Sequence, residues 1–558
     1  MHVGAIKTEE IQLYCNCCKN PTIYQSDELS LLVPQYGNFG YDVMEYIGRA
    51  IFQRYRTEDE VVKELSSLNV PISKSEVGYL GRKFIVYLAI AHKNIVSKLK
   101  FHMQMKGGYI LHLDGTNEGA SPHLLSVLDE LSQFVLASIK IPTENAELII
   151  LLLEEIKRRF GVPIAIVSDM GKGIRSAVNQ VFPGVLFFIC HFHFLRDIGK
   201  DLLEEHYAII RNLLKKYGIS TRLRYRLAQY DEKINKEDIE IQFSKITELK
   251  NLTEKLDECQ IITVCYTLIQ WALDGKNKGN GYGFPFDRPH FEFYTRLCRI
   301  HDILENYNNE HEKITSKARK IVQKLLNDIE PLLYNKKGIT TSQDIKEKIS
   351  VFDSLRQSMR ITLDDSKKGI NDNGEEIDIK TIEENMKEFR NWLIKEKDCK
   401  KNSAYKKMLE QIDKYWLNLF ADPITLKIST GEIIIVQPQR TNNIMEQFFR
   451  GFRRSERRKS GNNSICKRLQ TMIAETPLVK NLENTEYMNI LLDGKSSLKE
   501  CFSEIQHKIM LEEFETANYN DEKIPTKIKK AIRDKDIPSI FLNLAQKYFD
   551  SKSNRILV

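Results

Sequence analysis

Two aspartates end apolar segments that have the pattern of buried strands. Residues 109–114, YILHLD, alternate with a period of two and end on Asp114, and the segment VPIAIVSD ends on Asp169. Hard cations such as Mg²⁺ prefer oxygen ligands, so carboxylates at neighbouring strand ends can share them. Two ions roughly 3.5–4 Å apart can activate a nucleophile and stabilise a leaving oxygen on phosphorus. The pair therefore predicts two Mg²⁺ or Mn²⁺ ions, although Asp114 before Gly115 is also typical of a tight turn.

A third carboxylate is needed to hold two ions, and Glu446 is the leading candidate. In a helix, Glu446 shares a face with Arg450, Arg453 and Arg454. An acid on a cationic face suits an active site beside DNA phosphates, but a solvated helix with one ion pair has the same pattern. Two rival third acids are Glu432 and Glu456. Nearer the first aspartate, we interpret Glu118 and Asp129 as turn residues and Glu144 as a helix-start charge.

The elements around the two aspartates predict a mixed sheet. Strands are expected at 109–114, 123–128 and 133–140, followed by a helix capped by Thr143 or Asn145. The strand that ends at Asp169 then leads into a helix, another strand at GVLFFIC and a further helix. A three-strand meander followed by alternating helices and strands indicates an α/β, mixed α+β class with the order of a ribonuclease-H-like core. In that order the strands of Asp114 and Asp169 are neighbours.

The N-terminal part predicts helices rather than strands. After a Cys-containing segment at 1–40, helices are expected over YDVMEYIGRAIFQRY and TEDEVVKELSS, with Thr57 and Glu60 at capping-box spacing. A third helix, capped by Ser73 or Ser75, is expected to run to about Met105. Residues 41–106 therefore predict a helix-turn-helix-like DNA-binding region, with a plain helical bundle as the alternative.

The remaining segments complete six predicted parts of the chain. The core is expected at 107–207 and 431–475, separated by a helical insertion at 208–430 with Trp271, Trp392 and Trp416 as core anchors. GEIIIVQP indicates a short strand, and the following helix is expected to be capped by Thr441 or Asn442. Residues 476–558 predict a C-terminal helical region.

Composition indicates an ordinary globular chain with one basic cluster. Hydrophobic residues make up 42% and charged residues 28% of the 558 residues. The apolar run at 148–153 is far shorter than the ~20 residues that span a bilayer, and the N-terminus has no apolar core of signal-peptide length. We therefore expect a cytoplasmic, nucleoid-associated protein. Residues 440–468 hold nine Lys or Arg against two Glu, a surplus that equals the net charge of +7 of the whole chain.

Three blocks resemble a known family. HLDGTNEG, VSDMGKGIRSAVNQVFPGVLFFICHFHFLRD and TNNIMEQFFRGFRR resemble the signature blocks of DDE transposases of the mutator-like and related bacterial insertion-sequence groups. The resemblance implies a ribonuclease-H-like core with a helical insertion, in which Asp114, Asp169 and Glu446 are the catalytic metal ligands. It also implies a Cys-x-x-His signature, here Cys190 and His193.

The resemblance implies a function on double-stranded DNA. By this resemblance, a DNA strand is expected to be cut at the end of a mobile element, and the released 3′-hydroxyl is expected to attack a target phosphodiester. A homodimer or larger assembly is expected to hold the two ends. Alternatives are a transposase-derived DNA-binding protein without catalysis and a nuclease that only hydrolyses. The residues expected to contact DNA come from one segment: Arg440, Asn442, Asn443, Arg450, Arg453, Arg454, Arg457 and Arg458.

The cysteines give a weaker signal. Ten cysteines without regular spacing indicate reduced thiols. Cys15, Cys17 and Cys18 contain half of a zinc-ribbon motif, but no second pair follows nearby, and structural zinc takes four ligands. The same argument favours a structural or DNA-contacting role for Cys190 and His193 over zinc binding.

Overall fold

The computed structural model describes residues 26–233, 236–248, 256–277, 279–310, 316–361, 378–396, 402–420, 422–428, 430–438, 443–462, 464–518, 528 and 536–553. Contacts divide the chain into two compact units. The first comprises Met1–Asn94, Thr471–Val479 and Leu491–Val558, and the second comprises Ile95–Gln470 and Lys480–Ile490. This division into two units does not test the six segments expected from the sequence, which remain a prediction.

The first unit is helical in its described part. A capping box at Thr57 and Glu60 begins its third helix, as predicted, and the Ser73 hydroxyl caps the fourth by accepting from Glu76 N at 3.2 Å. The predicted long helix to Met105 is wrong, because it is interrupted at Ile95, where the division between the two units also falls. The helices are α1 (Asp27–Ser30), α2 (Tyr41–Phe52), α3 (Glu58–Ser67), α4 (Lys74–Asn94), α20 (Leu498–Ser503), α21 (His507–Asn518) and α23 (Ile537–Ser553).

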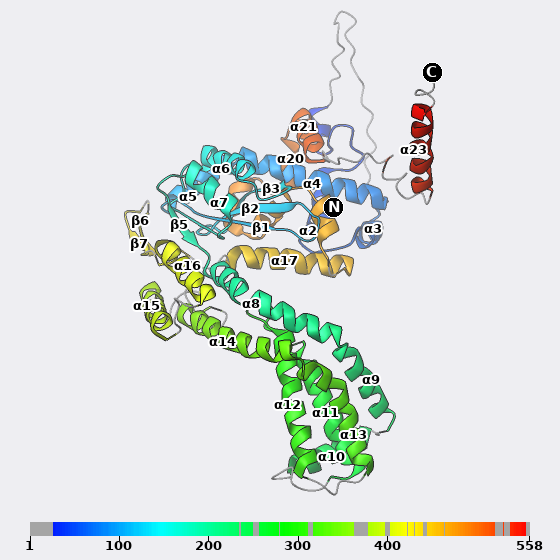
Figure 1. The fold of residues 1–558 in the computed structure, drawn as a ribbon. Helices are drawn as coiled ribbons and strands as arrows, with labels where there is room; N and C mark the ends of the chain where they lie inside the picture. The colour runs from blue at the N-terminus through cyan, green and yellow to red at the C-terminus, as the bar shows by residue number, and fades with distance from the viewer. Residues whose placement is uncertain are drawn as a thin grey trace, which may run out of the picture. The chain divides into compact units, whose positions relative to one another are not determined.

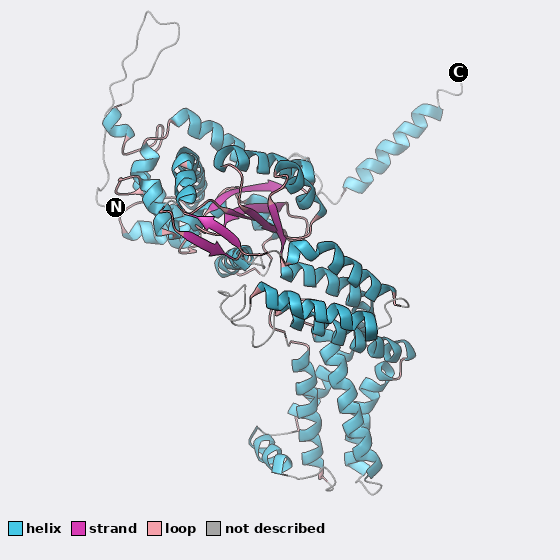
Figure 2. Ribbon diagram, turned by 90° about the vertical axis from the view of Figure 1, so that its left-hand side faces the viewer, coloured by secondary structure: helices cyan, strands magenta, loops and turns pink. Residues whose placement is uncertain are grey.

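The second unit contains a five-stranded mixed sheet with helices packed against it (Figure 2). The strand order is β3-β2-β1-β4-β5, with β1, β2 and β3 antiparallel and with β4 and β5 parallel to β1. This sheet confirms the predicted mixed α+β class. The strands are β1 (Ile110–Thr116), β2 (His123–Asp129), β3 (Val135–Ile141), β4 (Ala165–Ser168) and β5 (Leu186–Ile189). The neighbouring helices are α5 (Val96–Met105), α6 (Ala146–Phe160) and α7 (Lys172–Val181).

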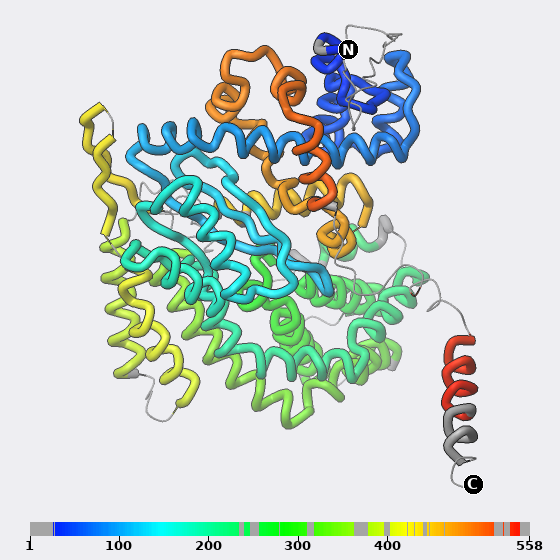
Figure 3. The backbone as a smooth tube through the Cα atoms, turned by 90° about the horizontal axis from the view of Figure 1, so that it is seen from above, coloured from blue at the N-terminus to red at the C-terminus, as the bar shows by residue number. Residues whose placement is uncertain are grey.

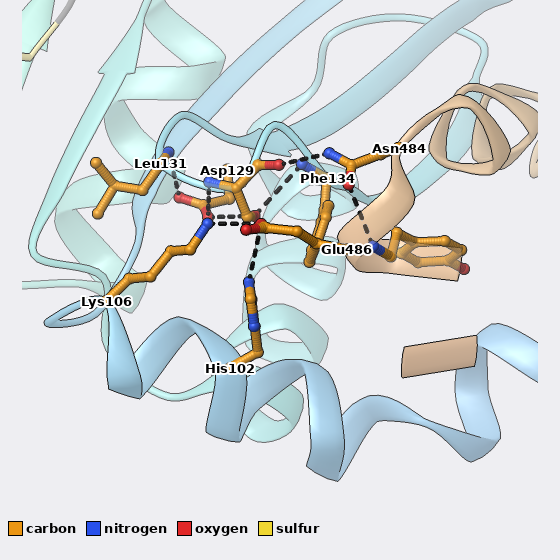
Figure 4. A network of polar contacts seen from close by, with 9 residues as sticks. His102, Lys106, Asp129, Leu131, Phe134, Asn484 and Glu486 are labelled. Carbon is orange, nitrogen blue, oxygen red and sulfur yellow. Dashed lines mark hydrogen bonds and ion pairs between the residues drawn. The ribbon is translucent and has the colours of Figure 1, made fainter. Parts of the chain in front are cut away.

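The outer edge of the sheet, at β3, is covered by residues 480–490. The Asn481 side chain accepts from Val135 N at 2.7 Å and donates to Val135 O at 2.8 Å, so it takes the place of a neighbouring strand. Asn484 donates to Ser132 O, and Glu486 accepts from Lys106 (Figure 4). The elements of this region are η1 (Thr476–Glu483) and α19 (Thr485–Leu492).

The helical insertion has two apolar cores. One joins β5 and α8 to α14, α15 and α16, and the other joins α9, α11, α12 and α13. The three tryptophans pack at the margins of these cores and are only half-buried. The helices, mostly green in Figure 3, are α8 (His191–Lys216), α9 (Ile219–Asp231), α10 (Lys236–Glu248), α11 (Glu258–Gly275), α12 (Pro289–Glu310), α13 (Ser316–Leu333), α14 (Lys336–Met359), α15 (Ile379–Glu396) and α16 (Ser403–Leu419).

The chain returns to the core through a hairpin and a basic helix. The predicted short strand is β7 (Ile433–Val436), which pairs with β6 (Ile424–Lys427) in a separate two-stranded sheet. β6 lies inside the stretch 208–430 that was predicted to be helical. It forms a strand there because it pairs with β7, which comes from beyond that stretch. Helix α17 (Asn443–Ser460) follows, then α18 (Cys466–Thr471), and α17 lies along the sheet (Figure 1).

Candidate active site

The two aspartates occupy equivalent positions on adjacent parallel strands. β1 pairs with β4 so that Leu113 lies opposite Ser168, and each aspartate is the next residue along its strand. Neighbouring strands are about 4.8 Å apart. The expectation that these strands lie side by side is confirmed, and the pairing brings Asp114 and Asp169 to the same edge of the sheet.

The alternative of a tight turn at Asp114 is wrong. β1 continues through Gly115 to Thr116, since Gly115 pairs with Leu125 and Thr116 with Leu124 of β2. The Asp114 carboxylate accepts from Gly115 N at 2.8 Å, and the residue is only 6% exposed. Asp114 is therefore fixed within a paired strand, with a buried carboxylate.

Asp169 lies among other charged groups. Its carboxylate accepts from Gly171 N at 2.9 Å. Burial raises the pKa of Asp169; the Gly171 N–H and Arg196 lower it, whereas the negative charges of Glu144 and Asp197 raise it further. An added cation would relieve this accumulation of negative charge.

Helix α17 lies beside the end of β1. Arg453 Nη2 donates to Thr116 Oγ1 at 2.6 Å, two residues beyond Asp114. Position 446 lies seven residues before Arg453, two turns along the same face of the helix. The side chains of Glu446 and Asn443 lie outside the described part of the structure, as do residues Arg440, Thr441 and Asn442 entirely.

The rival acids have other partners or positions. Glu456 pairs with Arg468 at 3.2 Å, and Glu432 is exposed in the turn between β6 and β7. Glu118 is a loop residue, as predicted, and its carboxylate accepts from Ile465 N at 2.8 Å. This hydrogen bond lowers the pKa of Glu118 and ties the loop after β1 to the segment after α17.

Glu144 is more than a helix-start charge. Asn145 is the N-cap of α6, so Glu144 precedes the helix, and its carboxylate pairs with His123 Nδ1 at 3.1 Å. The sequence analysis gave Glu144 only the role of a helix-start charge, and it did not single out His123 or, on α8, Arg196 and Asp197. The predicted three-strand meander could have pointed to His123 and Glu144. In a meander, the start of β2 and the end of β3 lie at the same end of the sheet as the end of β1.

The Cys-x-x-His signature begins α8 immediately after β5. Cys190 N donates to Ser168 O at 2.9 Å, which joins this junction to the end of β4. His193 is 5% exposed, and burial lowers its pKa to about 3. The full burial of Cys190 and its backbone hydrogen bond to β4 support a structural role. The other sequence candidates for zinc, Cys15, Cys17 and Cys18, lie outside the described residues.

The donor atoms at this edge suit a hard cation only in part. Carboxylate oxygens of Asp114 and Asp169 are the ligands that Mg²⁺ prefers, and it is commonly bound by one or two carboxylates together with substrate phosphates. Within the described ranges, no group of three or more His, Cys, Asp or Glu side chains is placed to hold a metal ion. The pair therefore fits a cation if a third ligand comes from elsewhere, such as Glu446 or a DNA phosphate.

Exposed arginines cover the outer part of α17. Arg450, Arg453, Arg454, Arg457 and Arg458 are all exposed, while Met445 and Phe449 are buried on the opposite side. Guanidinium groups suit phosphate oxygens. The helix therefore presents a cationic face close to the candidate active site.

Comparison with known proteins supports the resemblance seen in the sequence. Residues 125–261 match the model of the family described as "Transposase, Mutator family". The matched segment includes Asp169, Cys190 and His193, and it supports a mutator-like transposase. No curated protein matches the chain. Among the described helices, none has the length and apolar character needed to span a membrane.

Proposed function

We propose that the chain is a metal-dependent DDE transposase, which cleaves DNA at the ends of a mobile element and joins those ends to target DNA. The equivalent positions of Asp114 and Asp169 on adjacent parallel strands carry this proposal. The strand order 3-2-1-4-5 supports a ribonuclease-H-like core, and the match to Mutator-family transposases supports the substrate class.

The proposed ligands of the two cations are Asp114, Asp169 and Glu446. When bound, Mg²⁺ or Mn²⁺ supplies an activated oxygen nucleophile and stabilises the leaving oxygen of an in-line displacement. Asp114 is held in register by pairing on both sides of β1, and Asp169 is oriented by the Gly171 N–H. Because Asp114 lies within paired β1 and Asp169 directly follows β4, both carboxylates are held by the core sheet and little reorganisation is needed for the reaction.

The arginines of α17 are proposed to bind phosphates on both sides of the scissile bond. The Arg453–Thr116 hydrogen bond keeps this helix next to β1, so DNA on the arginine face lies near the carboxylates. Arg440, Asn442 and Asn443 extend the same contact surface in the proposal. Since two element ends must be joined, we propose a homodimer or larger assembly that acts on the nucleoid.

A donor plasmid separates this function from its alternatives. Supercoiled plasmid with candidate element ends and Mg²⁺ is incubated with the full chain and a target DNA. Joined products support a transposase, nicks alone indicate a nuclease, and a gel shift without cleavage indicates a DNA-binding protein.

Matched variants assign the chemistry to the aspartates. Asp114→Asn and Asp169→Asn are expected to abolish both cleavage and joining while DNA still shifts, whereas Asp231→Asn, which removes an exposed acid at the end of α9, leaves both steps intact. Joining by either of the first two variants would refute the assignment of that residue.

A further inference from the structure

The carboxylate of Glu144 reaches the backbone that follows each aspartate, which is the end of β1 after Asp114 and the loop after Asp169. A Cβ atom built on Gly115, the residue after Asp114, would lie 3.0 Å from Glu144 Oε1. A Cβ on Gly171, whose N–H binds Asp169, would lie 3.7 Å from Glu144 Oε2 and 3.0 Å from Asp169 Oδ1. The two oxygens of one carboxylate therefore lie beside the backbone next to each aspartate.

Glycines make room for Glu144 at this edge. Besides Gly115 and Gly171, Gly173 approaches it so closely that a Cβ would lie 2.3 Å from the Glu144 carbonyl oxygen. None of the three has the positive φ that favours glycine. Glycine at 115 and 173 is therefore explained by the space that Glu144 occupies rather than by backbone conformation, whereas at Gly171 the close neighbour is the Asp169 carboxylate.

A histidine and an asparagine hold the Glu144 side chain in place. His123 Nδ1 lies 3.1 Å from Glu144 Oε1, and Asn117 Nδ2 lies 3.1 Å from His123 Nε2. If the asparagine amide donates to Nε2, the imidazole proton is on Nδ1 and points to Glu144. The carboxylate is thereby oriented by residues from β2 and from the loop after β1.

We propose that Glu144, held by His123, is a positioning residue of the metal site, which fixes the end of β1 after Asp114 and the loop after Asp169 and adds negative charge that attracts divalent cations. This inference rests on the proposed function, since it assigns a role within that site. It does not require Glu144 to be a ligand itself. Partners that orient metal ligands typically contribute about 10- to 100-fold to metal affinity.

Mn²⁺ binding to the full chain without DNA tests this role. Free Mn²⁺ is measured by electron paramagnetic resonance during titration of wild type, Glu144→Gln and Glu147→Gln. Glu147 is the matched control, because it is an exposed acid in the first turn of the same helix. We expect about 10-fold weaker Mn²⁺ binding for Glu144→Gln and wild-type binding for Glu147→Gln.

Two further variants separate position from charge. Gly115→Ala keeps every charge but presses a methyl group against Glu144 Oε1, so it should also weaken Mn²⁺ binding. Glu144→Asp keeps the acid and should recover part of the affinity lost in Glu144→Gln. If Glu144→Gln does not fold, as judged by circular dichroism, Gly115→Ala still gives the answer.

The outcomes distinguish this inference from the proposed function. Wild-type Mn²⁺ affinity in Glu144→Gln and Gly115→Ala, together with its loss in Asp169→Asn, would overturn the role of Glu144 and leave the proposed function intact. Wild-type affinity in Asp169→Asn and Asp114→Asn would overturn the metal site itself, and with it both proposals.

Discussion

Asp129 and Asp169 are acids in the same sheet with opposite surroundings. Asp129 is fully buried and accepts from Ile110 N at 3.0 Å, Leu131 N at 3.2 Å, Ser132 N at 2.9 Å and Ser132 Oγ at 2.5 Å (Figure 4). Asp169 is half-buried and accepts from Gly171 N, with the charges of Glu144 and Asp197 nearby.

The difference shows that burial of an acid does not by itself indicate chemistry. Burial raises the pKa of both carboxyl groups, but donors from its own turn and from Ile110 of β1 surround Asp129, whereas Asp169 has the acids Glu144 and Asp197 nearby. A carboxylate whose acceptor positions are filled by the protein stabilises a turn. One that faces like charges is more stable when a cation is added.

The largest expected effect is the loss of activity in Asp169→Asn. Removal of a metal ligand should slow cleavage and joining by at least about 10³-fold, since stabilisation of about 4 kcal/mol in the transition state is lost. The free energy of unfolding should stay the same or rise, because repulsion at the site is reduced. Urea denaturation beside the plasmid assay measures both, and a strongly destabilised variant would contradict this view of Asp169.

Asp129→Asn should show the reverse pattern. The amide NH₂ would face N–H and O–H groups that now donate to the carboxylate, which costs about 3 kcal/mol. We expect a lower midpoint of urea denaturation and unchanged activity per folded molecule. Loss of activity without loss of stability would instead place Asp129 in the chemistry.

Asn481→Ala should destabilise the outer strand β3 of the sheet. It leaves Val135 N and O without their side-chain partner in a buried place, at a cost of about 2 kcal/mol. Asn462→Ala, at an exposed position after α17, serves as the control in the same denaturation series. Equal midpoints for the two variants would show that Asn481 does not protect the edge strand.

The smallest effect concerns an acid on the surface of α6. Hydrogen bonds from Arg158 and Arg159 lower the pKa of Glu155 to about 2. A lowered pKa stabilises the folded state above the unfolded value near 4.5 and ceases to do so as the pH falls toward 2. Because Glu155 is partly exposed to solvent and Arg158 is fully on the surface, Glu155→Gln should cost only about 0.5 kcal/mol at pH 7.

Thermal denaturation at several pH values tests this prediction. The difference between wild type and Glu155→Gln should shrink as the pH falls from 4.5 toward 2. A constant difference across that range would show that the ion pair makes no contribution.

Local sequence patterns predicted most elements of the core. The period-two runs gave β1 to β3, and the Thr57–Glu60 spacing gave the start of α3, because these signals depend on neighbours within a few residues. The predicted end of β1 at Asp114 was wrong, since pairing with β2 carries the strand through Gly115. The predicted continuous helix to Met105 was wrong as well, because nothing in its periodicity marks the break at Ile95.

By itself, the sequence determined that two acids end apolar segments of strand pattern and that the basic surplus is concentrated in one segment, since residue type and period are local properties. Only the tertiary structure decided which groups meet at the strand ends. The register of β1 and β4 sets Asp114 beside Asp169, and the meander brings His123 and Glu144 to the same edge. Such encounters depend on pairing between distant segments, and a one-residue shift of register would separate the two aspartates.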